Sequence, residues 1–204
     1  MTPLLFNLLF VTAAYLLGSL SFAVIVSHRM GLDDPRGYGS GNPGATNMLR
    51  SGRKSAAALT LLGDALKGWL AVWLAKHFGP QLGLHESLAA WCGLAAFVGH
   101  VFPVFFGFKG GKGVATAVGV WLGFHLWLGL ACIATWLAMT ALFRISSLSA
   151  LTTAVLAPVY TVMILGWNAF AWVALVMSAL LIYRHKSNIQ KLMAGTENRL
   201  GQSE

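Results

Sequence analysis

Long apolar runs with few charged side chains restrict the fold of this chain more than any other feature. One such run, residues 113–143, has 31 consecutive positions without Asp, Glu, Lys or Arg. Hydrophobic residues make up 57% of the 204 residues and charged residues only 10%, whereas a soluble globular domain carries roughly 25% charged residues. A soluble fold of this length cannot bury so much apolar surface. The sequence therefore predicts a polytopic membrane protein.

The lengths of the apolar runs predict how many helices cross the membrane. A helix needs about 20 apolar residues to span the hydrocarbon core, and runs of that order cover residues 3–27, 56–76, 87–106, 150–166 and 168–183. The run 113–143 is long for one span and short for two. We predict that it forms a hairpin of two short helices, near 113–124 and 126–143, which brings the total to seven spans.

The basic residues favour seven spans and orient them. With seven, the segments 28–54, 107–112, 144–149 and 184–204 share one face, which then carries twelve of the fourteen Lys and Arg residues. A single span over 113–143 would split this set. Because cytoplasmic loops are enriched in Lys and Arg, we expect an all-α, seven-helix protein with its N-terminus outside and its C-terminus cytoplasmic. Residues 1–204 are expected to form a single integral membrane domain.

The net charge of +8 does not indicate nucleic-acid binding, because the basic residues are distributed as membrane topology requires. Cys92 and Cys132 both lie in apolar runs, so they are predicted to be buried free thiols and not metal ligands. No internal repeat is evident, so an inverted-repeat transporter is not supported.

The first polar segment, residues 37–50, has the composition of an anion-binding loop. Its glycines allow consecutive backbone N–H groups to converge on an anion, and Arg50 adds a planar fork suited to phosphate. A flexible Gly/Ser linker is the alternative, but such linkers rarely mix Asn, Thr and Arg in this way. The candidate phosphate-binding residues here are Ser40, Gly41, Asn42, Gly44, Thr46, Asn47 and Arg50.

The second polar segment, residues 108–116, resembles a P-loop only loosely. Lys112 is followed by Gly113 instead of the required Ser or Thr, and no strand is predicted before it. The mechanics are still similar, because glycines expose backbone donors, lysines supply charge, and a helix from Val114 points its N-terminus at the site. A tight turn with cytoplasmic lysines is the alternative. The candidate residues are Lys109, Gly110, Gly111, Lys112, Gly113 and Thr116.

Two further polar segments are expected on the same face. Residues 144–149 are predicted to form a turn in which Ser147 and Ser149 either bind substrate or cap a helix. The tail, residues 184–199, could interact with anionic lipid, but a polybasic anchor does not need His185, Asn188 or Glu197.

Asp64, Lys67 and His100 are ionisable residues inside predicted spans. Asp64 and Lys67 are three residues apart, so they share a helix face and can pair. Ionisable groups within a span usually face the bundle interior and often serve function, and a functional and a purely structural pair both remain open. His100 is either a packed residue or one that lines a site.

Several motifs in the same order resemble one known family over nearly the whole chain. They are residues 39–50, 64–68, 99–103 together with 108–116, the Ser-Leu-Ser of 147–149, and 184–199. On these motifs the chain resembles the bacterial acyl-phosphate:glycerol-3-phosphate 1-O-acyltransferases, the PlsY family. Lys191 stands where arginine is common in that family.

The resemblance implies transfer of a fatty acyl group from acyl phosphate to glycerol 3-phosphate, the first acylation step of phospholipid synthesis. It implies a seven-helix fold in the bacterial inner membrane, with the active site on the cytoplasmic face and no metal or organic cofactor. Expected partners are the two substrates, membrane lipid and a soluble enzyme that produces acyl phosphate, and no nucleic acid. The acyl chain is expected in an apolar groove between helices.

The residues taken as catalytic are Ser40, Lys112, His185 and Asn188; Glu197, Ser147 and Ser149 are grouped with the substrate-binding set. Direct acyl transfer is expected, with the substrate's own phosphate as proton acceptor and His185 in a positioning role; His185 as the base is the alternative. Two alternatives belong to other classes. A phosphate-ester transporter predicts a two-sided polar path, and a non-catalytic membrane scaffold does not need four ordered polar motifs.

Overall fold

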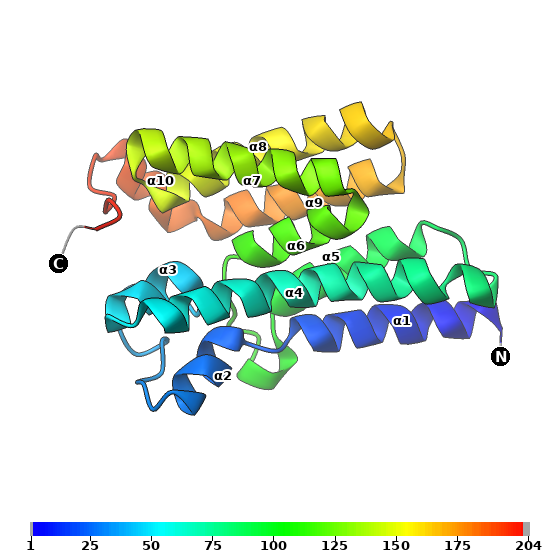
Figure 1. The fold of residues 1–204 in the computed structure, drawn as a ribbon, viewed down its shortest axis with the longest axis horizontal. Coiled ribbons are helices and arrows are strands. Elements are labelled where there is room, and N and C mark those ends of the chain that lie inside the picture. Colours follow the sequence, from blue (N-terminus) through cyan, green and yellow to red (C-terminus); the bar gives the residue numbers. More distant parts are fainter. Residues whose placement is uncertain (1, 202–204) are drawn as a thin grey trace. The chain divides into compact units, whose positions relative to one another are not determined.

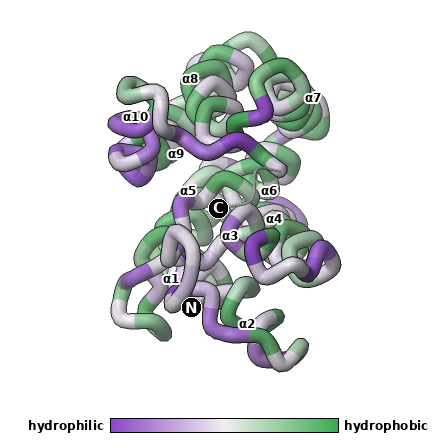
Figure 2. Tube along the Cα trace, turned by 90° about the vertical axis from the view of Figure 1, so that its left-hand side faces the viewer, coloured by the Kyte–Doolittle hydropathy of each residue, from purple (hydrophilic) through white to green (hydrophobic). Residues whose placement is uncertain are grey.

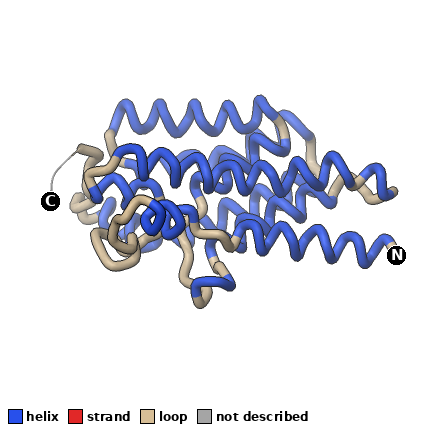
Figure 3. The backbone as a smooth tube through the Cα atoms, turned by 60° about the horizontal axis from the view of Figure 1, so that its bottom comes forward, coloured by secondary structure: helices blue, strands red, loops and turns tan. Residues whose placement is uncertain are grey.

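The computed structural model describes residues 2–201, and every regular element in that range is helical (Figure 3). A helix satisfies its backbone hydrogen bonds within its own segment, which is a requirement for crossing lipid. The helices form two compact units, Met1–Phe124 and His125–Glu204.

The first unit contains the helices from α1 to α6, together with short 3-10 helices (Figure 1). They are α1 (Pro3–Gly18), α2 (Phe22–Arg29), α3 (Ala45–Met48), η1 (Leu49–Ser51), α4 (Lys54–Phe78), η2 (Pro80–Leu82), α5 (Leu88–Val101), η3 (Val104–Phe106) and α6 (Val114–Phe124). α4 packs against α5 and α6, and α1 packs against α5.

Glycines at the helix crossings of this unit allow backbones to approach closely. A Cβ on Gly18 of α1 would overlap the backbone of Ala96 on α5, and a Cβ on Gly119 of α6 would overlap the backbone of Ala65 on α4. Because glycine has no side chain, the two helices pack closely at these crossings. Close packing increases their van der Waals contact, which drives helix association in lipid.

The predicted first span, residues 3–27, is not one straight helix. It breaks after Gly18, and α2 departs from the direction of α1 by 46°. The break leaves backbone groups without helical partners, and one of them, the carbonyl of Leu20, accepts a hydrogen bond from the Lys67 ammonium at 2.5 Å. An orphaned carbonyl in an apolar interior is costly, so Lys67 stabilises the broken geometry, which the run of apolar residues could not reveal.

The second unit consists of α7 (Leu126–Phe143), α8 (Ser146–Leu165), α9 (Ala169–Arg184) and α10 (Lys186–Met193). α8 packs against both α7 and α9. α10 follows α9 after a bend of 60° at His185. Hydrophobic residues cover α7 and α8, whereas α10 is largely hydrophilic (Figure 2), so the tail helix has the composition of an element at the edge of a membrane.

The predicted division of the run 113–143 is confirmed at the level of helix boundaries. α6 ends at Phe124 and α7 begins at Leu126. His125 has extended backbone between them, and its Nδ1 accepts a hydrogen bond from the backbone N–H of Trp127. This bond satisfies one of the orphan donors at the start of α7.

The predicted turn at residues 144–149 is wrong in part. α8 begins at Ser146 and not near residue 150, its N-cap is Ile145, and no side chain caps it. Ser147 and Ser149 therefore lie in the first helical turn. Ser149 Oγ donates to the carbonyl of Ile145 and accepts from Thr140 Oγ1, and these local bonds let the helix begin earlier than hydropathy indicates.

Four helices are long and apolar enough to cross a membrane within the described residues, and six spans result if each bent pair is one span. The bent pairs are α1 with α2 and α9 with α10, and α6 is a shorter apolar helix. The chain is thus an all-helical protein with several candidate membrane spans. Seven spans and the sidedness of the termini stay predictions.

Candidate functional site

The loop that carries residues 37–50 is organised by Asn47. This buried side chain donates through Nδ2 to the carbonyls of Pro35 at 2.7 Å and Tyr38 at 3.2 Å, and its Oδ1 accepts from the backbone N–H of Ser40 at 3.0 Å. Three bonds from one amide hold both ends of the glycine-rich turn. Asn47 was predicted as a phosphate ligand, and here its amide holds the loop itself.

Arg50 lies against the same turn because Gly39 has no side chain. A Cβ on Gly39 would lie 2.8 Å from Arg50 Nη1 and would overlap Asn47 Oδ1. Gly39 also has φ = +57°, a left-handed backbone conformation that favours glycine. Gly39 was not among the predicted phosphate-binding residues, yet its missing side chain leaves room for the Arg50 guanidinium beside the turn.

The other predicted residues of this loop are arranged around that turn. Ser40, Gly41 and Thr46 are exposed and Asn42 and Gly44 are partly exposed. The backbone N–H of Asn42 points to Ser40 Oγ at 3.5 Å, and that of Gly44 donates to the carbonyl of Asn42. The loop thus presents small polar groups and one guanidinium beside a rigid turn.

Met48 anchors the loop to the helices of the first unit. Its side chain is fully buried in a cluster with Ala23 and Val26 of α2 and Ala56 and Ala57 of α4. Its sulfur accepts hydrogen bonds from Ser27 Oγ at 3.4 Å and Tyr38 Oη at 3.5 Å. Because Met48 lies between Asn47 and Arg50 in the chain, this anchor fixes where the loop meets the helices.

Arg36 connects the loop to the second polar segment. Its guanidinium lies 5.4 Å from the centroid of the Phe106 ring, in cation–π geometry, and pairs with Asp34 at 2.6 Å. The hydrogen bonds from Arg36 lower the pKa of Asp34 below its ordinary value. Arg36 and Phe106, the residues directly before segments 37–50 and 107–113, therefore lie close together in the first unit.

The glycine–lysine turn, residues 107–113, has unusual backbone at three positions. Gly107, Phe108 and Gly113 have φ of +59°, +61° and +89°. Lys109 is exposed and Lys112 partly exposed, whereas Gly110 and Gly111 are buried. The two lysines are therefore presented by a tightly folded turn, and α6 begins at Val114 as predicted.

Thr116 lies in a helix interface. Its side chain is fully buried, and its carbonyl and Cγ2 face Gly68 of α4. Its hydroxyl has no hydrogen-bond partner within residues 2–201. Thr116 was predicted to bind substrate, but its position in the interface between α6 and α4 is enough to explain a small side chain there.

The second unit brings three of the predicted residues together at one carboxylate. Oε1 of Glu197 accepts hydrogen bonds from Ser147 Oγ and from Asn188 Nδ2, both at 2.6 Å. Ser147 belongs to α8 and Asn188 to α10, so Glu197 joins the two helices. Ser149 does not take part, because its hydroxyl is bonded to Thr140 and Ile145.

His185 occupies the bend between α9 and α10. It is buried, and its Nδ1 lies 2.8 Å from the carbonyl of Leu181. A carbonyl only accepts hydrogen bonds, so Nδ1 carries the proton.

The end of the described chain is also held in the second unit. The backbone N–H of Leu200 donates to the carbonyl of Arg144 at 2.7 Å. The tail is thus tied to the start of α8 at two points.

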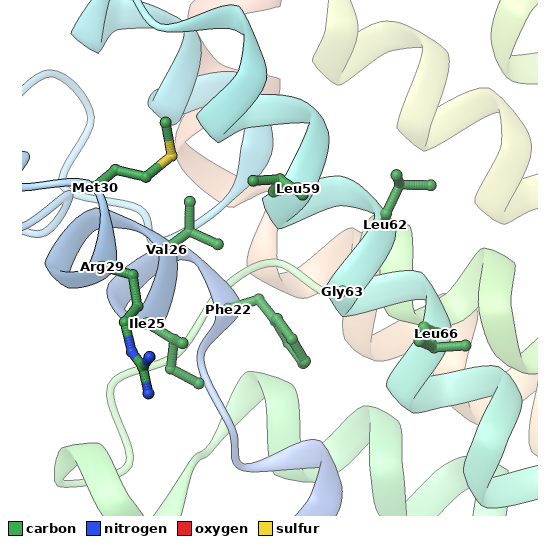
Figure 4. A pocket seen from close by; sticks show the side chains of 9 residues that line it. All are labelled: Phe22, Ile25, Val26, Arg29, Met30, Leu59, Leu62, Gly63 and Leu66. Carbon is green, nitrogen blue, oxygen red and sulfur yellow. The ribbon is translucent and has the colours of Figure 1, made fainter.

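An apolar groove lies between α2 and α4 in the first unit (Figure 4). Its volume is about 440 Å³, within the range of ligand pockets. Arg29 is the single charged side chain that lines it. The other lining residues are Phe22, Ile25, Val26, Met30, Leu59, Leu62, Gly63 and Leu66.

No group of three His, Cys, Asp or Glu side chains that could hold a metal ion occurs within residues 2–201. Besides the Glu197 carboxylate, the polar groups of the predicted segments are hydroxyls, amides, cationic side chains and backbone N–H groups. This is the chemistry that binds phosphate.

Comparisons with known proteins agree with this chemistry. A model of the glycerol-3-phosphate acyltransferase family matches residues 8–195. A glycerol-3-phosphate acyltransferase of Thiobacillus denitrificans is 66% identical over 195 residues, which cover 96% of this chain and 98% of that protein. One from Chromobacterium violaceum is 60% identical over 94% of each chain.

Solved structures share the fold as well. The crystal structure of PlsY (YgiH), an integral membrane glycerol 3-phosphate acyltransferase, in its glycerol 3-phosphate form, matches with a TM-score of 0.88 and 38% identity over 96% of both chains. Its lysophosphatidic acid form matches with a TM-score of 0.87 and 37% identity, over 96% of this chain and 95% of the other.

Proposed function

Because the chain belongs to the glycerol-3-phosphate acyltransferase family, we propose that it transfers a fatty acyl group from acyl phosphate to glycerol 3-phosphate. The products are 1-acylglycerol 3-phosphate and inorganic phosphate. The observation that carries the proposal is the match of residues 8–195 to the family. The proposal is also supported by the crystal structures of PlsY, which are described as its glycerol 3-phosphate form and its lysophosphatidic acid form.

The first unit supplies groups suited to two phosphate-bearing substrates. The Arg50 guanidinium, Ser40 and the backbone N–H groups of the glycine-rich loop bind one phosphate, and Lys109 and Lys112 of the glycine–lysine turn add positive charge. Asn42, Thr46 and the glycines 41, 44, 110, 111 and 113 shape these surfaces. Asn47 and Thr116 support them from within, in keeping with their burial and contacts.

In the reaction, the glycerol hydroxyl oxygen attacks the acyl carbonyl carbon. The carbon–oxygen bond to phosphate breaks, the new ester bond forms, and phosphate leaves with the bonding electron pair. The hydroxyl proton passes to a phosphate oxygen, whose second pKa lies near 6. Lysines and backbone N–H groups stabilise the negative charge that develops on the carbonyl oxygen and on the leaving phosphate.

The second unit positions its polar groups for the same chemistry. His185, whose Nδ1 lies 2.8 Å from the carbonyl of Leu181, is assigned to orientation, because the substrate phosphate is proposed as the proton acceptor. Glu197 holds Asn188 and Ser147. We assign Glu197 to positioning, because a carboxylate that touched phosphate directly would repel it.

The apolar groove between α2 and α4 is assigned to the acyl chain. Its lining is aliphatic and aromatic except for Arg29, whose charge suits the phosphate end of an acyl phosphate. Leu59→Trp, which adds bulk to one wall, is expected to shift the preference toward shorter acyl chains. Rates measured with acyl phosphates of 10, 14 and 18 carbons test this, and an unchanged chain-length profile contradicts the assignment.

The proposed setting is a single domain in the bacterial inner membrane, with seven spans, the N-terminus outside and the polar loops cytoplasmic. A soluble enzyme that makes acyl phosphate supplies the donor. Both native cysteines are buried, so single cysteines can be labelled selectively. Arg53→Cys and Asn198→Cys are expected to resist an impermeant thiol reagent in intact cells, whereas Thr2→Cys reacts. The reverse pattern overturns the proposed orientation.

Turnover by the purified protein tests the reaction itself. We expect lysophosphatidic acid from acyl phosphate and glycerol 3-phosphate and no comparable rate with acyl-CoA. No polar segment of the chain resembles a site for adenine or pantetheine. Equal rates with the two donors contradict the proposed donor, and no product with either one contradicts the proposed function.

A further inference from the structure

Three buried ionisable side chains form a cluster inside the first unit. Asp64 Oδ1 lies 2.8 Å from Lys67 Nζ and 3.4 Å from His100 Nδ1. Exposed fractions are 2% for Asp64, 2% for Lys67 and 7% for His100. The pairing of Asp64 with Lys67 predicted from their spacing is confirmed, and His100 joins them from α5. The proposed phosphate chemistry makes no use of these three residues.

Stability alone does not account for such a cluster. Removing charges from water costs several kcal/mol per ion, and apolar residues of similar volume often serve a fold equally well. A buried polar network instead fixes one arrangement of the segments that it joins, because few other arrangements satisfy all its members. The role of the cluster therefore depends on which segments it joins.

The cluster holds two irregular segments of backbone. Lys67 donates to the carbonyl of Leu20 in the break between α1 and α2. On the other side, the carbonyl of His100 accepts a hydrogen bond from the backbone N–H of Gly111 at 3.2 Å. Gly111 belongs to the glycine–lysine turn, directly before Lys112.

The imidazole of His100 lies against this turn. A Cβ on Gly111 would overlap His100 Nε2, so the ring occupies the space where a side chain would be. A cavity of about 10 Å³ between Lys67, His100, Gly110 and Gly111 holds at most one water molecule. With so little free volume, a movement of the ring moves the backbone next to Lys112.

We propose that His100, held through Asp64 by the buried ion pair with Lys67, is a positioning residue that sets the geometry of the glycine–lysine turn for substrate phosphate. The inference rests on the proposed function in one respect, that this turn binds phosphate. His100 itself does not touch substrate. It fixes Gly111 by packing, and Gly111 in turn fixes the position of Lys112.

The two neighbouring glycines provide a matched pair for the test. A Cβ on Gly111 meets the imidazole of His100, which a mutation can replace by a shorter side chain. A Cβ on Gly110 meets the backbone carbonyls of His100 and Val101, which no mutation removes. His100→Asn keeps a polar group in reach of Asp64 and removes the Nε2 side of the ring. It therefore makes room for an alanine at position 111 and none for one at position 110.

The experiment measures kcat and KM for both phosphate-bearing substrates in the single and double variants. Gly111→Ala and Gly110→Ala are each expected to raise the KM of at least one substrate roughly tenfold or more, because small displacements of a binding group have large effects. Adding His100→Asn is expected to recover about threefold or more of that loss in Gly111→Ala and none in Gly110→Ala. His77→Ala, an exposed histidine on α4, is the control and leaves both constants unchanged.

Equal recovery in the two glycine variants, or none in either, overturns the proposal. His100→Ala replaces His100→Asn if the latter does not fold, as judged by its melting temperature in detergent. The rise in melting temperature on adding glycerol 3-phosphate serves as a second readout. If glycerol 3-phosphate stabilises the wild-type protein but acyl phosphate is not turned over, the proposed donor is refuted. The positioning role of His100 is then tested by the rise in melting temperature in the same variants.

Discussion

The polar loops of the first unit and the carboxylate cluster of the second unit are built in different ways. The first unit organises its loops with glycines, backbone bonds and a buried ion pair, and the cationic side chains of Arg50 and Lys109 are exposed at the surface. The second unit uses one side chain, Glu197, as the shared acceptor for residues from two helices. Loss of the exposed cations and added volume at the glycines are therefore expected to damage the first unit strongly, whereas loss of the Glu197 charge is expected to damage the second unit less.

The largest effect is expected for the exposed cation of the first unit. Arg50→Ala should slow acyl transfer by roughly 30- to 1000-fold, because a lost charged phosphate contact costs on the order of 2–4 kcal/mol. Arg50→Lys should also be poor, since a point charge does not replace the planar fork. Lys112→Ala and Asn188→Ala are expected in the same range. Initial rates against Arg53→Ala, a nearby exposed arginine, measure this, and near-normal rates in all these variants remove the phosphate clamp.

Added volume in the first unit comes next. Gly39→Ala should reduce activity by about 10- to 100-fold, because the new Cβ displaces the Arg50 side chain and Asn47 Oδ1. Gly52→Ala is the control, because Gly52 has φ = +76° and a Cβ added there would meet no atom within 4 Å. Both variants carry similar backbone strain, about 1–2 kcal/mol. Equal losses of activity in the two would show that strain, and not the position of Arg50, is responsible.

Lost charge in the second unit should have a smaller effect. Glu197→Gln keeps one acceptor but weakens two charge-assisted bonds, which should cost about 1 kcal/mol, or roughly fivefold in kcat/KM. Ser147→Ala removes a single bond, and we expect about half that free energy. Melting temperatures measured alongside the rates separate orientation from stability. A loss of stability with unchanged kcat/KM would mean that Glu197 does not orient Asn188 for the reaction.

The surface pair Asp34–Arg36 should matter least. Arg36 holds the pKa of Asp34 below its ordinary value, so the pair stabilises the fold above the unfolded-state pKa, and this stability is lost as the pH falls through the folded-state pKa. Both side chains are more than a third exposed, so Asp34→Asn should cost at most a few tenths of a kcal/mol near neutral pH. Unfolding curves of both proteins at pH 7 and in acid measure the difference. A difference that grows in acid contradicts the assignment.

Several structural features followed from local patterns in the sequence. Spacing alone paired Asp64 with Lys67, because residues three apart share a helix face. The length and lack of charge of residues 113–143 indicated two helices, and they separate at His125. Hydropathy placed α4 within two residues of the predicted span 56–76.

Other features depend on contacts between residues distant in the chain. The break after Gly18 is stabilised by the bond between Lys67 and Leu20, 47 positions apart. Glu197 was expected to bind substrate, and only the fold shows that its carboxylate accepts hydrogen bonds from Ser147 and Asn188. Gly39 and Arg36 were not among the predicted site residues. The only signal in the sequence was the recurrence of glycine in residues 37–44, which indicates that other groups approach the backbone closely there.

The sequence by itself determined that this chain is a helical membrane protein of the glycerol-3-phosphate acyltransferase type and which short segments carry its polar chemistry. Apolar length, charge placement and local spacing are properties of neighbouring residues, so they can be read along the chain. The tertiary structure decided what each polar residue touches: His100 the glycine–lysine turn, Asn47 its own loop, Thr116 a helix crossing. Those contacts depend on which helices pack together and how closely their glycines let them approach, and no local pattern encodes that geometry.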